Sequence, residues 1–136
     1  MDPILHLSLA VRDLDEARAF YVDVLGCKIG RVRDGWIDVW FYGMQLTLHE
    51  EPDFVSAPDP RAVRHFGVTL DAEALTALLE RIRTQTIVPA IEWLRPVATD
   101  HAGTPRAQTK AMIADPSGNA IELKTYADPA AAFSDR

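Results

Sequence analysis

The sequence passes through the same order of elements twice, and this internal repeat limits the fold more than any other feature. Residues 4–11 alternate apolar and polar side chains, as expected of a half-buried strand, and residues 64–70 alternate again. Each stretch leads into an amphipathic helix; Asp71 caps the second, and Asp13 caps the first in a predicted capping box with Glu16. Further β-type runs follow each helix. We therefore expect an α+β protein made of two strand–helix–strand units.

A chain of 136 residues accommodates both units in one domain. The stretch between the units is rich in proline and in acidic and small residues, which is typical of a linker. The last residues are polar and alanine-rich, and we expect them to be loosely held. The predicted organisation is one domain over residues 1–136, with module 1 at about 4–50, a linker at 51–63, module 2 at about 64–126 and a tail at 127–136.

The two modules differ in length. Their opening strands superpose at an offset of 59 residues (65 − 6), which matches His6 to His65. Their closing strands, aligned on Gly43 and Gly118, superpose at an offset of 75 residues (118 − 43). Module 2 is therefore longer by 16 residues (75 − 59). The prolines between residues 88 and 115 predict that this surplus forms a long loop.

Charge and composition exclude several kinds of partner. The chain has 14 Lys and Arg against 20 Asp and Glu, and the net charge of −6 argues against nucleic-acid binding, which requires basic patches. No apolar run reaches the roughly 18 to 20 residues that cross a membrane, and the first residues lack the pattern of a signal peptide. The single cysteine, Cys27, allows neither a disulfide framework nor a multi-cysteine zinc site. We expect a cytoplasmic protein that binds neither nucleic acid nor membrane.

Two histidines occupy equivalent positions in the repeat. His6 and His65 each share a strand face with small side chains, whereas large aliphatic residues occupy the other face. In the last predicted strand, Glu122 lies on the face opposite Ile121 and Leu123. Two imidazoles and one carboxylate form a facial site that suits divalent Fe, Mn, Co, Ni or Zn and leaves positions open for substrate. The alternative is that both histidines are tolerated polar residues and Glu122 is a structural carboxylate.

Three segments of the sequence resemble a known family. HLSLAVRDLDEARAFYVDVLG, HFGVTL and DPSGNAIELK, within residues 4–126, resemble the vicinal oxygen chelate superfamily of glyoxalases, bleomycin-resistance proteins and extradiol dioxygenases. The resemblance implies two tandem βαβββ modules that form a half-open barrel around a metal site, with His6, His65 and Glu122 at the ligand positions. It also implies a homodimer, and in some members strands from two subunits complete the site.

The number and type of the predicted metal ligands help to identify the class of reaction. Bacterial-type glyoxalase I has a fourth ligand, a glutamate, where this chain has Thr47, and Gln45 is the neutral residue that could take its place. Fosfomycin-resistance enzymes share the hydroxyl at Ser8 but have a tyrosine where this chain has Met112. The three-ligand set favours dioxygenase-like chemistry on a small oxygenated substrate, although the tyrosine of the dioxygenases has no obvious counterpart. The alternatives are a glyoxalase-like lyase or isomerase, and a metal-free drug-binding protein of the bleomycin-resistance type.

An aromatic strand face in module 1 is a candidate wall of the substrate site. Trp36, Asp38 and Trp40 share this face, which Tyr42 continues. Such a wall suits a planar or apolar ligand, and packing between subunits would use the same residues. The carboxylate of Asp38 favours the wet pocket, because an unpaired charge is costly in a dry interface.

Several polar side chains complete the candidate site. His49 and His101 are candidate general bases, and Lys124 is placed to hold an acidic group of a substrate, although each also suits a solvated surface position. Gln108 and Lys110 belong to a strand of module 2 that we expect to reach the same pocket. The predicted catalytic residues are Glu122, His49 and His101, and the predicted substrate-binding residues are Ser8, Trp36, Trp40, Thr47, Gln108 and Lys124.

Overall fold

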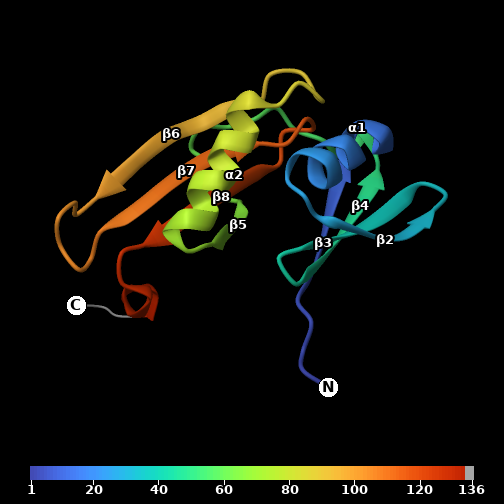
Figure 1. Cartoon of the computed structure of the whole chain (residues 1–136). Coiled ribbons are helices and arrows are strands. Elements are labelled where there is room, and N and C mark those ends of the chain that lie inside the picture. The colour runs from blue at the N-terminus through green and yellow to red at the C-terminus, as the bar shows by residue number, and fades with distance from the viewer. Residues whose placement is uncertain (134–136) are drawn as a thin grey trace.

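The computed structural model describes residues 1–133 and contains two four-stranded mixed sheets, one for each module (Figure 1). The strands are β1 (His6–Val11), β2 (Lys28–Arg33), β3 (Trp36–Phe41), β4 (Met44–Glu50), β5 (Phe66–Thr69), β6 (Trp93–Asp100), β7 (Gln108–Ala114) and β8 (Ala120–Tyr126). The helical segments are α1 (Leu14–Arg18), its π-helical continuation η1 (Ala19–Val24), α2 (Ala72–Thr84) and the short 3₁₀ turns η2 (Pro52–Phe54) and η3 (Pro129–Phe133). This order confirms the two predicted βαβββ modules. Residues 134–136 of the predicted tail lie outside the described part of the chain.

The two sheets have equivalent topologies. Their strand orders are β1-β4-β3-β2 and β5-β8-β7-β6, and over the described residues the sheets do not close into a barrel. In each module the first strand lies at a sheet edge, parallel to the closing strand, so that His6 pairs with Gln45 and Gly67 pairs with Glu122. The remaining pairs are antiparallel. Each sheet therefore places the start of its first strand beside its own closing strand.

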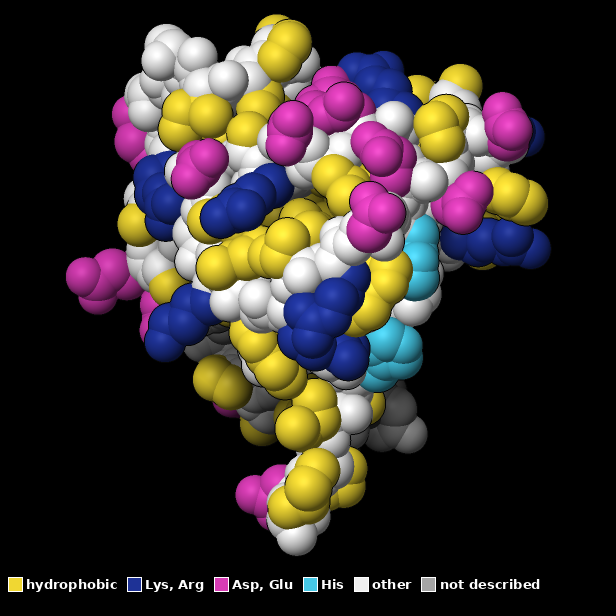
Figure 2. Space-filling view, turned by 90° about the vertical axis from the view of Figure 1, so that its right-hand side faces the viewer, with side chains coloured by type: hydrophobic (Ala, Val, Ile, Leu, Met, Phe, Trp, Pro, Cys, Tyr) yellow, Lys and Arg dark blue, Asp and Glu magenta, His cyan; other side chains and the backbone are white. Residues whose placement is uncertain are grey.

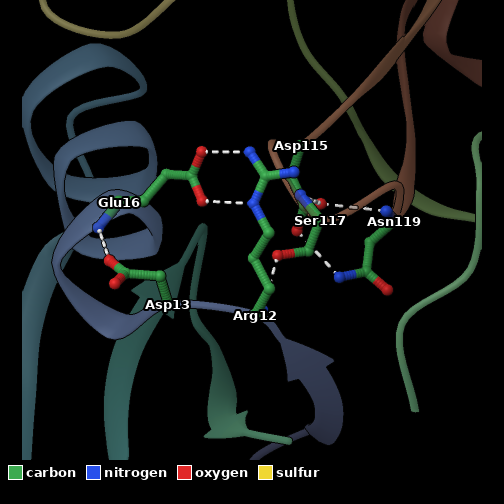
Figure 3. Close-up of polar contacts among 6 residues, drawn as sticks. All are labelled: Arg12, Asp13, Glu16, Asp115, Ser117 and Asn119. Carbon is green, nitrogen blue, oxygen red and sulfur yellow. Dashed lines mark hydrogen bonds and ion pairs between the residues drawn. The ribbon is translucent and has the colours of Figure 1, made fainter. Parts of the chain in front are cut away.

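The first helix begins and ends where the sequence predicts. The Asp13 carboxylate accepts a hydrogen bond from the Glu16 amide at 2.8 Å, which is the N-cap interaction. The Glu16 carboxylate, however, pairs with the Arg12 guanidinium instead of returning to Asp13, so the predicted capping box is only half formed (Figure 3). Gly26, at φ +81°, follows the helical segment as its left-handed terminating residue. No helix within residues 1–133 is long and apolar enough to cross a membrane.

One hydrophobic core contains residues from both modules. Its buried members include Phe20, Tyr21, Leu46 and Leu48 from module 1 and Leu75, Leu79, Ile121 and Leu123 from module 2. Helix α2 supplies its buried face from Leu75, Leu78, Leu79 and Ile82 and lies in front of the second sheet in Figure 1. Each sheet thus turns its apolar face to the shared core. The opposite face of each sheet, which carries His6 in one module and Glu122 in the other, does not contribute to this core.

The Asp115–Asn119 turn forms hydrogen bonds that connect the two modules. The buried Asp115 carboxylate accepts hydrogen bonds from the Tyr21 hydroxyl at 2.7 Å and from the Asn119 side chain at 2.8 Å. The same Asn119 amide nitrogen donates to the carbonyl of Ala10. The Ser117 hydroxyl oxygen accepts from the backbone amide of Arg12 (Figure 3). The sequence predicts this turn correctly. The structure adds that the turn forms hydrogen bonds to module 1.

The 16-residue surplus of module 2 is not one long loop, which corrects the sequence-based expectation: it is divided among slightly longer strands and longer connections before, between and after β6 and β7. Most of residues 88–115 form the long hairpin of β6 and β7, which extends beyond α2 in Figure 1. Pro96, which contributed to the prediction of a loop, lies inside β6. This strand is at the edge of the sheet, where a residue without an amide hydrogen is tolerated.

Candidate functional site

The structure brings together two of the predicted metal ligands on the second sheet. His65 directly precedes β5, Glu122 lies in β8, and the His65 Nε2 atom is 3.9 Å from Glu122 Oε2. The other ring nitrogen, Nδ1, is 2.7 Å from the carbonyl oxygen of Ala62. Because a carbonyl only accepts, Nδ1 carries the hydrogen, and in the neutral ring the lone pair is on Nε2, the nitrogen nearer to the carboxylate. An oriented imidazole of this kind is typical of metal-binding histidines.

A glycine makes this close arrangement of β5 and β8 possible. A Cβ atom on Gly67 would lie 2.0 Å from the backbone oxygen of Glu122, so the strands accept no side chain at this position. Beside it lies a hollow of about 220 Å³, lined by His65, Phe66, Gly67, Val68, Thr69, Glu122 and Lys124. The donor set in this hollow is nitrogen and oxygen, which suits the divalent ions predicted from the sequence. Two ligands, one oriented by its outer-shell carbonyl, therefore fit a divalent metal here.

Two lysines lie on the same face of this sheet. The Lys124 ammonium is 3.2 Å from Glu122 Oε1, and the Lys110 ammonium is 3.1 Å from Asp100 Oδ2. Lys110 and Lys124 stand directly opposite each other on β7 and β8. The sequence prediction placed Lys124 near the metal ligand but did not foresee the role of Asp100, because the pairing depends on strand register.

His101 and Gln108 lie together at the far end of this sheet. His101 follows β6 in the hairpin turn, with φ at +53°, and Gln108 pairs with Tyr126 across β7 and β8. Both line a separate hollow of about 440 Å³, which also includes Arg106. The structure thus associates these two predicted residues with each other and places neither in the hollow that His65 and Glu122 share.

The predicted residues of module 1 share the open face of the first sheet. His6 is exposed, with Nε2 at 3.3 Å from the Ser8 hydroxyl, and its strand neighbours Gln45, Thr47 and His49 follow along β4. Figure 2, which views the molecule from the module 1 side, shows histidine side chains at the surface near Lys and Arg side chains. Within residues 1–133 no three His, Cys, Asp or Glu side chains come together as a metal site. One chain therefore gathers His65 and Glu122 but not His6.

Asp38 occupies the centre of this face, and its environment differs from the predicted wet pocket. The carboxylate is 1% exposed and accepts hydrogen bonds from Arg31 Nε and Thr47 Oγ1, each at 2.6 Å, and from Gln45 Nε2 at 3.3 Å. Burial alone would raise the pKa of Asp38, but the bonds from Thr47 and Arg31 outweigh it and lower the pKa. Asp38 is paired, so its charge is no argument for a wet pocket.

The aromatic wall is shorter than predicted. Trp36 and Trp40 are half-buried on the same face as Asp38, and the Arg31 guanidinium lies 4.9 Å from the centre of the Trp36 ring. Tyr42, by contrast, follows the end of β3 in the turn to β4, with φ at +48°. Its ring packs edge-on against Phe41 with 5.0 Å between centroids. The two tryptophans alone remain as candidate contacts for an aromatic ligand.

Comparisons with known proteins identify the family. The model of the Glyoxalase/Bleomycin resistance protein/Dioxygenase superfamily matches residues 3–123. The chain is similar to a crystal structure of a glyoxalase/bleomycin resistance protein/dioxygenase from Alicyclobacillus acidocaldarius, with 30% identity, 96% of each chain covered and a TM-score of 0.81.

A more distant structure shares the fold. It is the genomically encoded fosfomycin resistance protein FosX from Listeria monocytogenes, with 16% identity, 92% of this chain and 93% of that chain covered, and a TM-score of 0.71. A search of curated proteins found no match. The family match and the structural likeness confirm the resemblance inferred from the sequence motifs. The chain belongs to the glyoxalase/bleomycin resistance protein/dioxygenase superfamily.

Proposed function

We propose that this protein is a metal-dependent enzyme that acts on a small oxygenated substrate. The observation that supports this most directly is the His65–Glu122 pair, in which the Nε2 nitrogen lies 3.9 Å from a carboxylate oxygen while Nδ1 is bonded to a carbonyl. A cation bound by both groups would stabilise a nitrogen and a carboxylate at this separation. A bound divalent ion, of Fe, Mn, Co, Ni or Zn, would supply Lewis-acid activation of substrate oxygens.

The chain's own residues would set the properties of such a site. Glu122 contributes one negative charge, which lowers the net charge of a divalent centre. The Ala62 carbonyl holds the His65 ring in the orientation that binding requires. Trp36 and Trp40 are the proposed contacts for a planar substrate on the opposing face.

We propose further that the site is completed by two copies of the chain. His6 is exposed on the open face of the first sheet, whereas His65 and Glu122 lie on the open face of the second. Pairing the first sheet of one copy with the second sheet of another covers both polar faces and adds the third ligand. A twofold axis then generates two equivalent sites in a homodimer.

Dioxygenase-like chemistry is the proposed reaction class. The state of Thr47 supports a three-ligand site, because this side chain is 5% exposed and donates its hydroxyl hydrogen to Asp38. Three protein ligands leave room for both a bidentate substrate and oxygen. A glyoxalase-like lyase or isomerase, which the bacterial type runs with four protein ligands, is the alternative.

Subunit complementation tests the metal site. The variants His6→Ala and Glu122→Gln are purified without chelator, and bound metal is measured for each and for an unfolded and refolded mixture of the two. Each variant alone should bind little metal. Random pairing in the mixture should restore about a quarter of the sites, because half of the dimers are mixed and each has one intact site. Wild-type metal content in either single variant would refute the ligand assignment, and no recovery in the mixture would refute the two-copy site.

Oxygen uptake then tests the reaction class. Protein loaded anaerobically with Fe(II) is mixed with a panel of catechols, and oxygen consumption is followed, with the Glu122→Gln variant as the inactive control. Uptake with one catechol supports a dioxygenase. Turnover of a hemithioacetal without oxygen uptake identifies a lyase instead. Tight binding of a bleomycin-type drug by a metal-free wild-type protein would replace the enzyme proposal with sequestration.

A further inference from the structure

We propose that Lys110 and Lys124 form a binding site for an oxyanionic group of the substrate, a carboxylate, phosphonate or phosphate. The sequence contains only three lysines, at positions 28, 110 and 124, in a chain with a net charge of −6. Two of them stand directly opposite each other on β7 and β8, on the face that carries Glu122. Like charges at directly opposed positions destabilise a sheet. One carboxylate beside each ammonium group offsets this cost, and an anion would bind as a second partner of the two lysines.

Both ammonium groups keep hydrogen-bond donors that such an anion could accept. Each is paired with a carboxylate: Lys124 with Glu122 at 3.2 Å and Lys110 with Asp100 at 3.1 Å. An ammonium group has three hydrogens, so each lysine keeps donors for a second acceptor. The two side chains are 29% and 35% exposed, which leaves them accessible yet partly shielded from water. Charge-assisted hydrogen bonds under these conditions are stronger than bonds between neutral groups.

The neighbouring β5 adds a polar contact. Thr69 pairs with Lys124 in the parallel register, and both line the hollow of about 220 Å³ that also contains Glu122. Lys124, at the edge of the proposed oxyanion site, is two residues along β8 from the proposed metal ligand Glu122, and Lys110 lies opposite Lys124 on β7. A substrate bound there carries its reacting oxygens toward His65 and its acidic group toward Lys124.

Glu122 couples this oxyanion site to the proposed metal site, and this part of the inference rests on the proposed function. Its Oε1 atom contacts Lys124, and its Oε2 atom faces His65. A divalent ion held by Glu122 would compete with Lys124 for the carboxylate. Lys124 then needs a new counter-charge, which the substrate's oxyanion provides. Metal and oxyanion should therefore bind with positive coupling.

A phosphate and acetate titration of the metal-free protein separates the two proposals. Binding is followed by ¹H–¹⁵N NMR at constant ionic strength through the backbone amides of Lys110 and Lys124. The variants are Glu122→Gln, which releases Lys124 without any metal, and Glu122→Gln combined with Lys124→Met, with Lys110→Met or, as the matched control, with Lys28→Met. We expect Glu122→Gln to bind one of the two anions about tenfold more tightly than the wild type, and either lysine substitution to cancel this gain. The variant that combines Glu122→Gln with Lys28→Met should keep this gain.

The outcomes in the metal-free protein do not depend on metal binding. Equal anion affinity in the wild type and in Glu122→Gln, or the same loss from Lys28→Met as from Lys124→Met in the Glu122→Gln background, would overturn the oxyanion site. Retained thermal midpoints confirm that the variants are folded. If the lysine variants behave as expected while the wild type binds no metal, the oxyanion site stands and the metal proposal fails. In the wild type, Co²⁺ should raise acetate affinity about tenfold, and no change would refute the coupling.

Discussion

The hydrogen bond from Tyr21 to Asp115 joins the two modules inside the shared core, and its removal leads to a pH-dependent prediction. The Tyr21 hydroxyl is buried and lies 2.7 Å from Asp115 Oδ2. Burial raises the pKa of Asp115, while the bonds from Asn119 and Tyr21 oppose this rise without cancelling it. The substitution Tyr21→Phe removes one of these bonds and leaves the ring packing in place.

The expected loss of stability in Tyr21→Phe depends on the hydrogen-bond partners that Asp115 keeps. The Asn119 side chain stays on the same oxygen, and two backbone amides stay on the other, so the carboxylate is not left without partners. A hydrogen bond to an ionised carboxylate contributes about 1.5–3 kcal/mol, and one to a neutral acid contributes about 1 kcal/mol. We expect Tyr21→Phe to lower the free energy of unfolding by about 2 kcal/mol at neutral pH and by about 1 kcal/mol in acid. For a domain of this size, the neutral-pH value corresponds to a fall in Tm of about 6 °C.

Proton linkage determines whether this loss of stability grows or shrinks as the pH rises. Tyr21 favours the ionised form of Asp115, so Tyr21→Phe raises the pKa of this carboxyl further above its usual value of 3.8. A group whose folded pKa is raised contributes stability below its unfolded pKa and loses it as the pH rises through the folded pKa. The variant should therefore lose stability more steeply than the wild type as the pH rises through this window.

Urea denaturation from about pH 4 to about pH 7, at one fixed protein concentration, measures this difference. Tyr42→Phe is the matched control, because Tyr42 lies half-exposed in the turn after β3. Tyr21→Phe should cost more than the control at every pH, and the gap should widen with pH. A loss that is equal at both ends of the range, or no larger than that of Tyr42→Phe, would refute the reasoning.

Three further predictions concern single positions. Gly67→Ala should destabilise the fold by more than about 2 kcal/mol, because its Cβ would lie 2.0 Å from a backbone oxygen of Glu122; urea denaturation measures the loss, and unchanged stability would contradict the strand geometry. Cys27 is buried, and burial raises the pKa of its thiol to about 11, so iodoacetamide at about pH 8 should label it only after urea unfolding, as mass spectrometry can verify. Asp38→Asn should cost about 1–2 kcal/mol at neutral pH, because Arg31 loses its charged partner. The pKa of Asp38 is lowered, so its contribution is present above the unfolded value and disappears as the pH falls through the folded one; a loss that persists in acid would contradict this.

Much of the fold could be predicted because its signals are local. Alternation over residues 4–11 and 64–70 reports which side chains share a strand face, and this depends only on neighbours two positions apart. The same local rule placed His6, His65 and Glu122 on faces that do not contribute to the core. A strand through Gln108 and Lys110 was predicted, but the extent of β6 was not, because a proline such as Pro96 fits a strand only at a sheet edge, and the edge is a property of the whole sheet.

The candidate site was harder to predict because its contacts depend on register. The pairing of Asp38 with Arg31, and the opposition of Lys110 and Lys124, follow from how strands align across a sheet. A shift of one residue would turn each of these side chains to the other face. For the same reason the sequence did not predict a role for Asp100, because Asp100 and Lys110 come together only in the folded hairpin.

The sequence alone determined the two-module architecture, the family and the strand faces that carry the histidines, because repeats, turns and alternation act over a few residues. Only the tertiary structure decided which of those residues meet. It placed His65 Nε2, just before β5, 3.9 Å from Glu122 Oε2 in β8, and it left His6 on the other sheet. The distance between residues far apart in the chain is set by sheet pairing and by the core that both modules share, and no local pattern encodes it.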